Sequence, residues 1–203
     1  MYFNEEDIEN LEKIFRVNLI NSCSGYKAAN LIGTVSGNNN NLAIFSSLVH
    51  LGSNPPLLGF FLRPTEIVPR HTYLNLKENQ YYTINSVEKE FADKAHHTSA
   101  KYDKSISEFK IVDLEPDFIN KFPSPYVKSS SIKIGMKFVE EIKISYNKSR
   151  LIVGKIVELH VNDDMIDKDG FLNLCKAEVA TISGCDGYSF PKNNSRKGYQ
   201  KPK

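Results

Sequence analysis

The chain has 203 residues, of which 40% are hydrophobic and 25% are charged, proportions that are typical of a globular protein. A chain of this length buries roughly 70% of its unfolded surface, so its core needs no disulfide bond or metal ion. The formal net charge is only +2, which excludes the strong positive field that attracts nucleic acid to a whole protein surface. We therefore expect no nucleic-acid polymer among its partners.

Three features of the sequence predict a cytoplasmic protein. The longest apolar run, Leu57–Leu62, is far shorter than the ~20 residues of a membrane span, so we expect no membrane partner. The start, Met1–Asp7, is acidic and lacks the basic and apolar regions of a signal peptide. Cys23, Cys175 and Cys185 are an odd number of cysteines without metal-ligand spacing, so we expect reduced thiols and no metal site.

Charge is unevenly distributed along the chain. Residues 28–62 contain no Asp, Glu, Lys or Arg, which is typical of strands that are buried on both faces or that line an apolar cavity. Residues 192–203 form a basic tail without an acidic residue, and we interpret it as a solvated or docked terminus rather than as a nucleic-acid arm. Its basic residues are Lys192, Arg196, Lys197, Lys201 and Lys203.

One amphipathic helix is predicted at the start, within residues 1–20. Asn4 suits the N-cap position, and the acidic residues after it interact favourably with the helix dipole. Apolar residues then recur at helical spacing, which predicts that the helix continues to about Leu19. These residues are Ile8, Leu11, Ile14 and Phe15.

Most of the remaining chain is predicted to form short strands. The expected strands are residues 29–36, 42–50, 57–62, 81–87, 131–136, 137–145, 151–161 and 178–183. The first two flank Gly37–Asn41, whose residues tolerate positive φ and predict a hairpin, and Asp169-Gly170 predicts another turn. Residues 71–79 and 91–100 are compatible with short helices. Many short strands with few helices favour a closed or partly closed β-barrel, in one domain over residues 1–203.

Several common sites are absent from the sequence. It contains neither the glycine-rich fingerprint of a Rossmann fold nor a P-loop. His96 and His97 are adjacent, so their side chains diverge on a helix and suit one metal ion poorly. Ser46 and Ser47 lack the glycines of a nucleophile elbow, which argues against a serine hydrolase.

A group of polar residues surrounds the uncharged segment instead. Arg63 and Arg70 follow the expected strand 57–62, and Thr72 opens the short helix after them. Two guanidinium groups beside a helix N-terminus suit a phosphate, although two exposed arginines and a capping threonine explain the pattern equally well. Ser46-Ser47 and the segment His97–Lys101 add further hydroxyl and basic groups.

Several blocks of the sequence, in a consistent order, resemble one known family. The blocks are Gly33-Thr34-Val35, residues 41–47, residues 53–60, Arg63-Pro64, residues 70–75, residues 82–85, residues 95–101, Ser107-Glu108-Phe109, residues 154–157, Asp169-Gly170 and residues 183–188. Together they resemble the flavin reductase-like, FMN-binding split-barrel family, which includes flavoredoxin-like flavin oxidoreductases. The similarity extends over residues 30–202.

The resemblance implies a mainly β fold, a six-stranded antiparallel split β-barrel with Greek-key topology, an N-terminal helix and short flanking helices. It also implies a homodimer that holds FMN at the subunit boundary. Carried over by position, Ser46, Ser47 and Leu48 would line the isoalloxazine and ribityl chain. Arg63, Arg70, His71 and Thr72 would hold the phosphate, and Thr98, Ser99 and Lys101 would close the site.

The function implied by the resemblance is a flavin reductase that transfers a hydride from NADH or NADPH to FMN. Reduced flavin would then serve an acceptor oxygenase or redox protein. A flavin performs this chemistry with little acid or base help from the protein, which agrees with the lack of a catalytic triad or carboxylate pair, so we predict no catalytic side chain. Two alternatives remain open: an FMN-binding electron-transfer protein without nicotinamide activity, and a ligand-binding barrel that has lost flavin.

Overall fold

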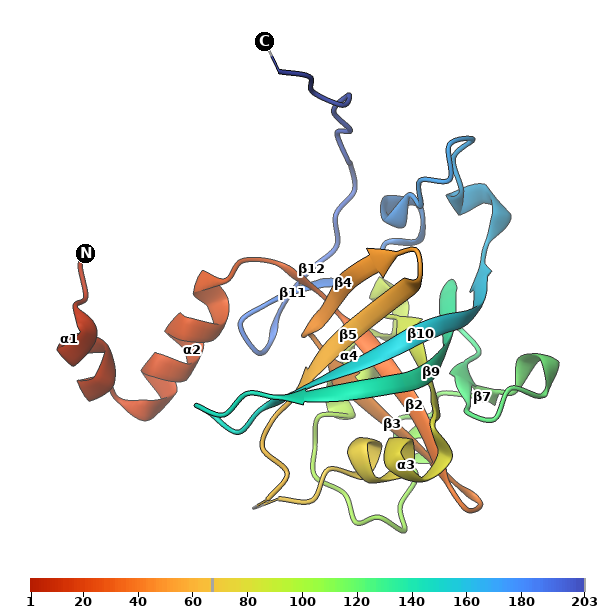
Figure 1. The fold of residues 1–203 in the computed structure, drawn as a ribbon, viewed down its shortest axis with the longest axis horizontal. Coiled ribbons are helices and arrows are strands. Elements are labelled where there is room, and N and C mark those ends of the chain that lie inside the picture. The colour runs from red at the N-terminus through yellow and green to blue at the C-terminus, as the bar shows by residue number, and fades with distance from the viewer. Residues whose placement is uncertain (67, 203) are drawn as a thin grey trace.

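The computed structural model describes residues 1–66 and 68–202. Its main feature is a seven-stranded antiparallel sheet with the strand order β3-β2-β6-β9-β10-β5-β4 (Figure 1). Its strands are β2 (Asn30–Ser36), β3 (Asn39–Phe45), β4 (Leu48–Ser53), β5 (Pro56–Leu62), β6 (Tyr81–Ser86), β9 (Ile132–Lys143) and β10 (Arg150–Val161).

The two edges of this sheet are joined directly. β3 and β4 are the edge strands, yet they follow each other in the chain with only Ser46 and Ser47 between them. A link of two residues spans at most about 10 Å, so the two edges must approach each other there. The sheet therefore curls round on itself, which confirms the expected mainly β split barrel.

The strand count of the barrel differs from the expected six, because the sheet has seven strands. The expected strand 42–50 is in fact two strands, which the bend at Ser46-Ser47 separates onto opposite edges. The opposite error occurs at Lys137, where two strands were expected and β9 continues unbroken. No turn-forming residue separates Met136 from Lys137, and both residues pair with β10 and with β6.

Smaller elements flank the barrel. A three-stranded sheet contains β1 (Lys27–Ala28), β11 (Thr181–Ser183) and β12 (Gly187–Ser189). A two-stranded sheet contains β7 (Pro116–Asp117) and β8 (Tyr126–Val127). The α-helices are α1 (Glu5–Asn10), α2 (Lys13–Cys23), α3 (His71–Asn79), α4 (Ala92–His97) and α5 (Glu108–Ile111), and 3-10 turns cover Lys89–Phe91, Ile119–Lys121, Asp163–Met165 and Leu174–Ala177. No helix among residues 1–66 and 68–202 combines the length and apolarity needed to cross a bilayer.

The N-terminal segment forms two helices rather than the single predicted one. Asn4 begins α1 as expected, since its side chain and that of Asp7 form a capping box. The helix ends at Leu11 because the Glu12 carboxylate accepts hydrogen bonds from the backbone N–H groups of Ile14 and Phe15 and thereby starts α2. Neither helix contains a buried residue, and both project from the barrel (Figure 1).

The sheet has a hydrophobic core on each face. Ile32 belongs to the core inside the barrel, whereas its neighbour Leu31 packs outside, against a layer that includes α4 and α5. Burial on both faces explains why β2 lacks charged residues. The same interpretation is wrong for β4, where Val49 and Leu51 are exposed although the segment is uncharged.

The other predicted turn and the basic tail are also seen. Gly170 has a φ of +83°, as the Asp169-Gly170 turn requires. Residues 190–202 have no regular structure, and Arg196 forms ion pairs with Asp167 and Asp169. The tail is therefore docked through this arginine, and Lys203 lies outside the described residues.

We predict that Gly33→Ala lowers the free energy of unfolding by roughly 2–3 kcal/mol, because overpacking of a close backbone contact forces the chain to move. A Cβ at Gly33 would collide with the Pro125 carbonyl oxygen and with the Thr83 hydroxyl that is bonded to it. Urea denaturation would measure the loss. Gly198→Ala is the control, since no atom lies within 4 Å of its Cβ position. Equal midpoints for the two variants would contradict the prediction.

Candidate functional site

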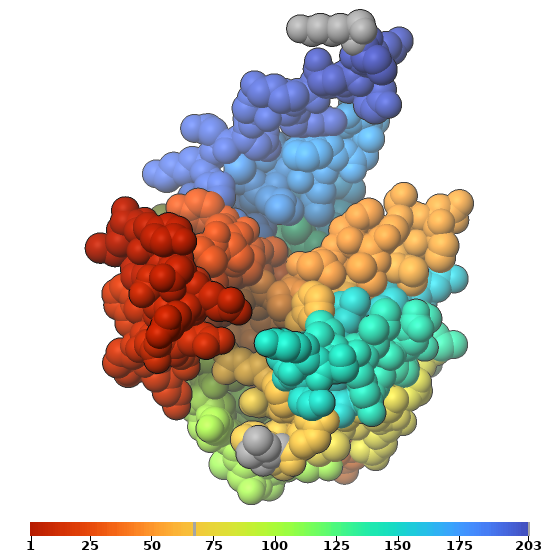
Figure 2. Space-filling view, turned by 60° about the vertical axis from the view of Figure 1, so that its left-hand side comes forward, coloured from red at the N-terminus to blue at the C-terminus, as the bar shows by residue number. Residues whose placement is uncertain are grey.

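A cleft of about 870 Å³ lies where the two edges of the barrel meet. Nine of the ten predicted site residues line it: Ser46, Ser47, Arg63, Arg70, His71, Thr72, Thr98, Ser99 and Lys101. The tenth, Leu48, does not, because its side chain packs against the core inside the barrel. In Figure 2, α2 and the hairpin between β9 and β10 stand on opposite sides of a hollow on this face.

The Ser46-Ser47 link forms one wall of the cleft. The Ser47 hydroxyl accepts a hydrogen bond from Phe61 N at 3.1 Å and donates one to Phe61 O at 3.0 Å. This side chain therefore takes the place of a backbone partner at the end of β5. The hydrogen bonds of its side chain therefore serve the fold.

Three basic side chains reach the cleft from two separate segments. Arg63 and Arg70 come from the loop between β5 and α3, and Lys101 comes from the segment after α4. None of them forms an ion pair with a carboxylate in the described part of the chain. The Arg70 Nε atom is buried and has no hydrogen-bond partner among those residues. A buried donor without an acceptor is costly, so this group suits an anionic ligand.

The polar floor of the cleft contains two residues that the sequence analysis did not select, Asn41 and Glu108. The buried Glu108 carboxylate accepts hydrogen bonds from Asn41 Nδ2 at 2.9 Å and from Leu42 N at 3.1 Å. Asn41 Oδ1 in turn accepts one from the Thr72 hydroxyl at 3.3 Å. The Thr72 hydroxyl is thus directed into this network. Both residues lie in blocks that carried the family resemblance, and Asn41 was also interpreted as part of a turn, but neither was assigned a role in the site.

The remaining predicted residues lie in the segment that follows α4. The Thr98 hydroxyl donates to Ala95 O at 2.7 Å and so caps that helix, while Ser99 is exposed at the cleft. Next to them, His97 Nε2 and the Tyr102 hydroxyl lie 2.6 Å apart. The cleft also contains residues that no local pattern indicated: Asn21 from α2, and Ile144, Asn147 and Ser149 from the β9–β10 hairpin.

Comparison with known proteins identifies the family. The model of the flavin reductase like domain matches residues 26–182. The chain belongs to this family. A protein of known structure from Shewanella frigidimarina NCIMB 400, provisionally assigned as a flavin reductase with a split barrel domain, is 42% identical. The match covers 98% of this chain and 100% of the Shewanella chain, with a TM-score of 0.94.

Two more distant structures show that the fold persists at low identity. Nitrilotriacetate monooxygenase component B from Bacillus cereus is 16% identical, with a TM-score of 0.84 over 97% of this chain and 98% of its own. Flavoredoxin of Desulfovibrio vulgaris (Miyazaki F) is 18% identical, with a TM-score of 0.75 over 86% of this chain and 92% of the flavoredoxin chain. An uncharacterized protein from Methanothermobacter thermautotrophicus is 28% identical over 125 residues, and the match spans 57% of this chain but only 59% of that relative's length.

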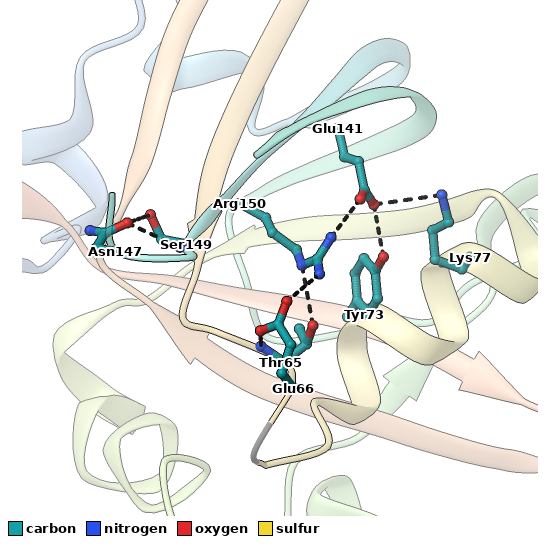
Figure 3. A network of polar contacts seen from close by, with 8 residues as sticks. All are labelled: Thr65, Glu66, Tyr73, Lys77, Glu141, Asn147, Ser149 and Arg150. Carbon is teal, nitrogen blue, oxygen red and sulfur yellow. Dashed lines mark hydrogen bonds and ion pairs between the residues drawn. The ribbon is translucent and has the colours of Figure 1, made fainter. Parts of the chain in front are cut away.

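Within this flavin reductase like domain, a cluster of ionic groups connects β9 and β10 with α3 and with the segment that follows β5 (Figure 3). Its centre is Arg150, the first residue of β10, whose side chain is only 9% exposed. We call this group the Arg150 cluster, and its members are Thr65, Glu66, Tyr73, Lys77, Glu141 and Arg150. Among residues 1–66 and 68–202, no three His, Cys, Asp or Glu side chains are grouped as metal ligands would be.

The contacts within the Arg150 cluster shift the pKa values of Glu141 and Tyr73. Burial alone would raise the pKa of Glu141, but the hydrogen bond from Tyr73 and the charges of Lys77 and Arg150 together hold that pKa below its ordinary value of 4.5. Burial and the same hydrogen bond raise the pKa of Tyr73. Glu141 is therefore a carboxylate, and Tyr73 its neutral donor, near neutral pH.

We predict that Glu141→Gln loses about 2 kcal/mol of stability at neutral pH, the scale of a charge-assisted hydrogen bond. A carboxyl whose pKa is lower in the folded state stabilises the fold above the unfolded value of 4.5, and it stops doing so as pH falls through the folded value. The difference in the free energy of unfolding between Glu141→Gln and the unmodified protein should therefore become smaller below about pH 4.5. Urea denaturation across this range would measure it.

Glu115→Gln is the control for this experiment. Glu115 also pairs with a lysine, Lys128, but its side chain is 66% exposed, so its removal should change stability by less than about 0.5 kcal/mol. A Glu141→Gln loss that stays constant from neutral to acid pH would contradict the assigned pKa direction.

Proposed function

We propose that this domain binds FMN in the cleft and transfers a hydride to it from NADH or NADPH. The observation that supports the proposal best is the convergence of Arg63, Arg70 and Lys101 on one cleft, without carboxylate partners in the described chain. The buried Glu108 is the acidic residue that faces them, and it is already hydrogen bonded to Asn41 and Leu42. The cleft therefore has an excess of positive charge, as an anionic ligand requires.

The basic end of the cleft fits a phosphate. Arg63 and Arg70 offer planar, fork-shaped donors, and the unpartnered Nε of Arg70 is one such donor. His71 and Thr72 belong to the first turn of α3 and line the cleft, so free backbone N–H groups of that turn lie at the same end. These four residues would hold the phosphate, and Lys101 would add charge from the opposite segment.

The apolar part of the cleft lining fits a flat ring. Its walls are apolar side chains together with the Ser46-Ser47 backbone, and the apolar residues are Ala43, Ile44, Phe45, Phe61 and Leu62. Bound FMN would supply the hydride chemistry itself, whereas the chain binds and orients it and limits the access of water. In this mechanism the chain needs no general acid or base, and the described lining residues contain no hydrogen-bonded pair of an acidic and a basic side chain.

We also propose the assembly and the partners of the protein. Apolar side chains are exposed on four neighbouring strands, and they are Val49, Leu51, Phe61, Val139, Ile142, Val157 and Leu159. A contiguous patch of this kind is typical of an interface, which supports a homodimer. The likeness to a monooxygenase component B supports an oxygenase as the acceptor of reduced flavin, and a cytoplasmic location agrees with this role.

We predict that the purified protein, supplied with FMN, oxidises NADH or NADPH at steady state. The absorbance of the nicotinamide would follow the reaction, and the flavin spectrum would report binding separately. Flavin binding without nicotinamide oxidation would favour the electron-transfer alternative. A protein that binds no flavin at all would contradict the proposal.

We predict that Arg63→Ala or Arg70→Ala weakens FMN binding about tenfold to a hundredfold, since each charge-assisted hydrogen bond contributes ~1.5–3 kcal/mol. Riboflavin lacks the phosphate, so its affinity should change little. Fluorescence titration with both flavins would measure the effect, and Arg196→Ala is the control because Arg196 pairs with Asp169 and does not line the cleft. Equal losses for FMN and riboflavin would exclude these arginines from a phosphate site.

A further inference from the structure

The loop that carries Arg63 and Arg70 is held by a residue far away in the sequence. Arg150 Nε donates to the Thr65 hydroxyl at 3.1 Å, and Arg150 Nη2 donates to Glu66 Oε1 at 2.8 Å. The other carboxylate oxygen of Glu66 accepts a hydrogen bond from Thr65 N at 3.0 Å. Arg150 thus contacts the middle of the loop, between the two arginines (Figure 3).

Arg150 is itself fixed on its other side. Its Nη1 donates to Glu141 Oε1 at 2.7 Å, and its guanidinium carbon lies 5.3 Å from the centre of the Tyr73 ring. The Tyr73 hydroxyl donates to the second oxygen of Glu141 at 2.8 Å. The guanidinium therefore connects the loop to β9 and to α3, two elements that are held by the sheet and its core.

The geometry requires an arginine. Three different nitrogen atoms of one planar group reach three acceptors, and the ammonium of a lysine cannot reproduce this fork. The cluster is also balanced in charge, with Arg150 and Lys77 against Glu66 and Glu141. Arg150 does not line the cleft, so it acts on a ligand only through the loop.

We propose that Arg150 is a positioning residue that fixes Thr65 and Glu66, which lie between Arg63 and Arg70 in the sequence, and so keeps these two arginines directed at the cleft. This inference rests on the proposed FMN site. A segment that is ordered before binding loses less conformational entropy when the ligand arrives. The anchor therefore adds affinity for the phosphate without touching it.

The test compares FMN with riboflavin in fluorescence titrations of Arg150→Lys, which keeps the charge and loses the fork. We expect FMN affinity to fall about tenfold and riboflavin affinity to fall less than about twofold. Arg196→Lys is the matched control, because it makes the same change at an exposed arginine that pairs with Asp169. It should alter neither affinity.

Thr65→Ala gives a second, uncharged variant in case Arg150→Lys folds poorly. It removes one acceptor of Arg150 from the loop, and FMN affinity should fall about threefold with riboflavin again unaffected. Trypsin cleavage after Arg70, followed without flavin, should be faster in both variants than in the Arg196→Lys control, because the loop is less restrained.

The outcomes separate this inference from the proposed function. If the unmodified protein prefers FMN over riboflavin and Arg150→Lys keeps the same preference, the positioning role is overturned while the FMN site stands. Parallel losses of both flavins together with a lower melting temperature would show a purely structural residue and would also overturn it. If the unmodified protein shows no preference for FMN, both the phosphate site and its positioning residue are wrong.

Discussion

The two-residue link Ser46-Ser47 joins the two edges of the barrel, and the cleft depends on that link. The Ser47 hydroxyl donates one hydrogen bond to Phe61 O and accepts one from Phe61 N, which extends the pairing of β4 with β5 at the point where the chain leaves β3 for the opposite edge of the sheet. The crossing brings the end of β3 next to the end of β5, and the loop after β5 leads directly to α3. This turn of the chain therefore places Ser46, Ser47, Arg63 and Arg70 at one cleft.

Ionic and amide groups hold the lining of the cleft in place. Arg150 and Glu141 anchor the loop that carries two of the basic groups, whereas Glu108 fixes Asn41 and the end of the Thr72 side chain from below. The basic side chains of Arg63 and Lys101 are exposed, so their charges are accessible to a ligand. Buried acidic and amide groups that hold the lining from behind leave these cations available for an anion.

Local patterns in the sequence predicted much of the fold. The helix α3 begins and ends where the sequence predicts, and the hairpin of β2 and β3 follows from the residues Gly37–Asn41. The contacts that organise the site could not be predicted in this way. Arg150 and Thr65 are 85 residues apart, and Asn41 and Glu108 are 67 apart, so no periodicity or turn signal links either pair. The polar character of the site residues singled them out and the family resemblance gave them roles, but neither carries information on what holds them in place.

The interior of the barrel is filled by side chains such as Phe60, Tyr82 and Met136, and the cleft lies at its rim. Among the described residues, the cleft lining shares only Phe45 and Leu62 with this core. Most cleft positions can therefore be substituted without leaving a cavity or a clash in the barrel. Such a separation lets natural selection change what the protein binds while the scaffold stays the same, and relatives that are 16% and 18% identical do keep the scaffold.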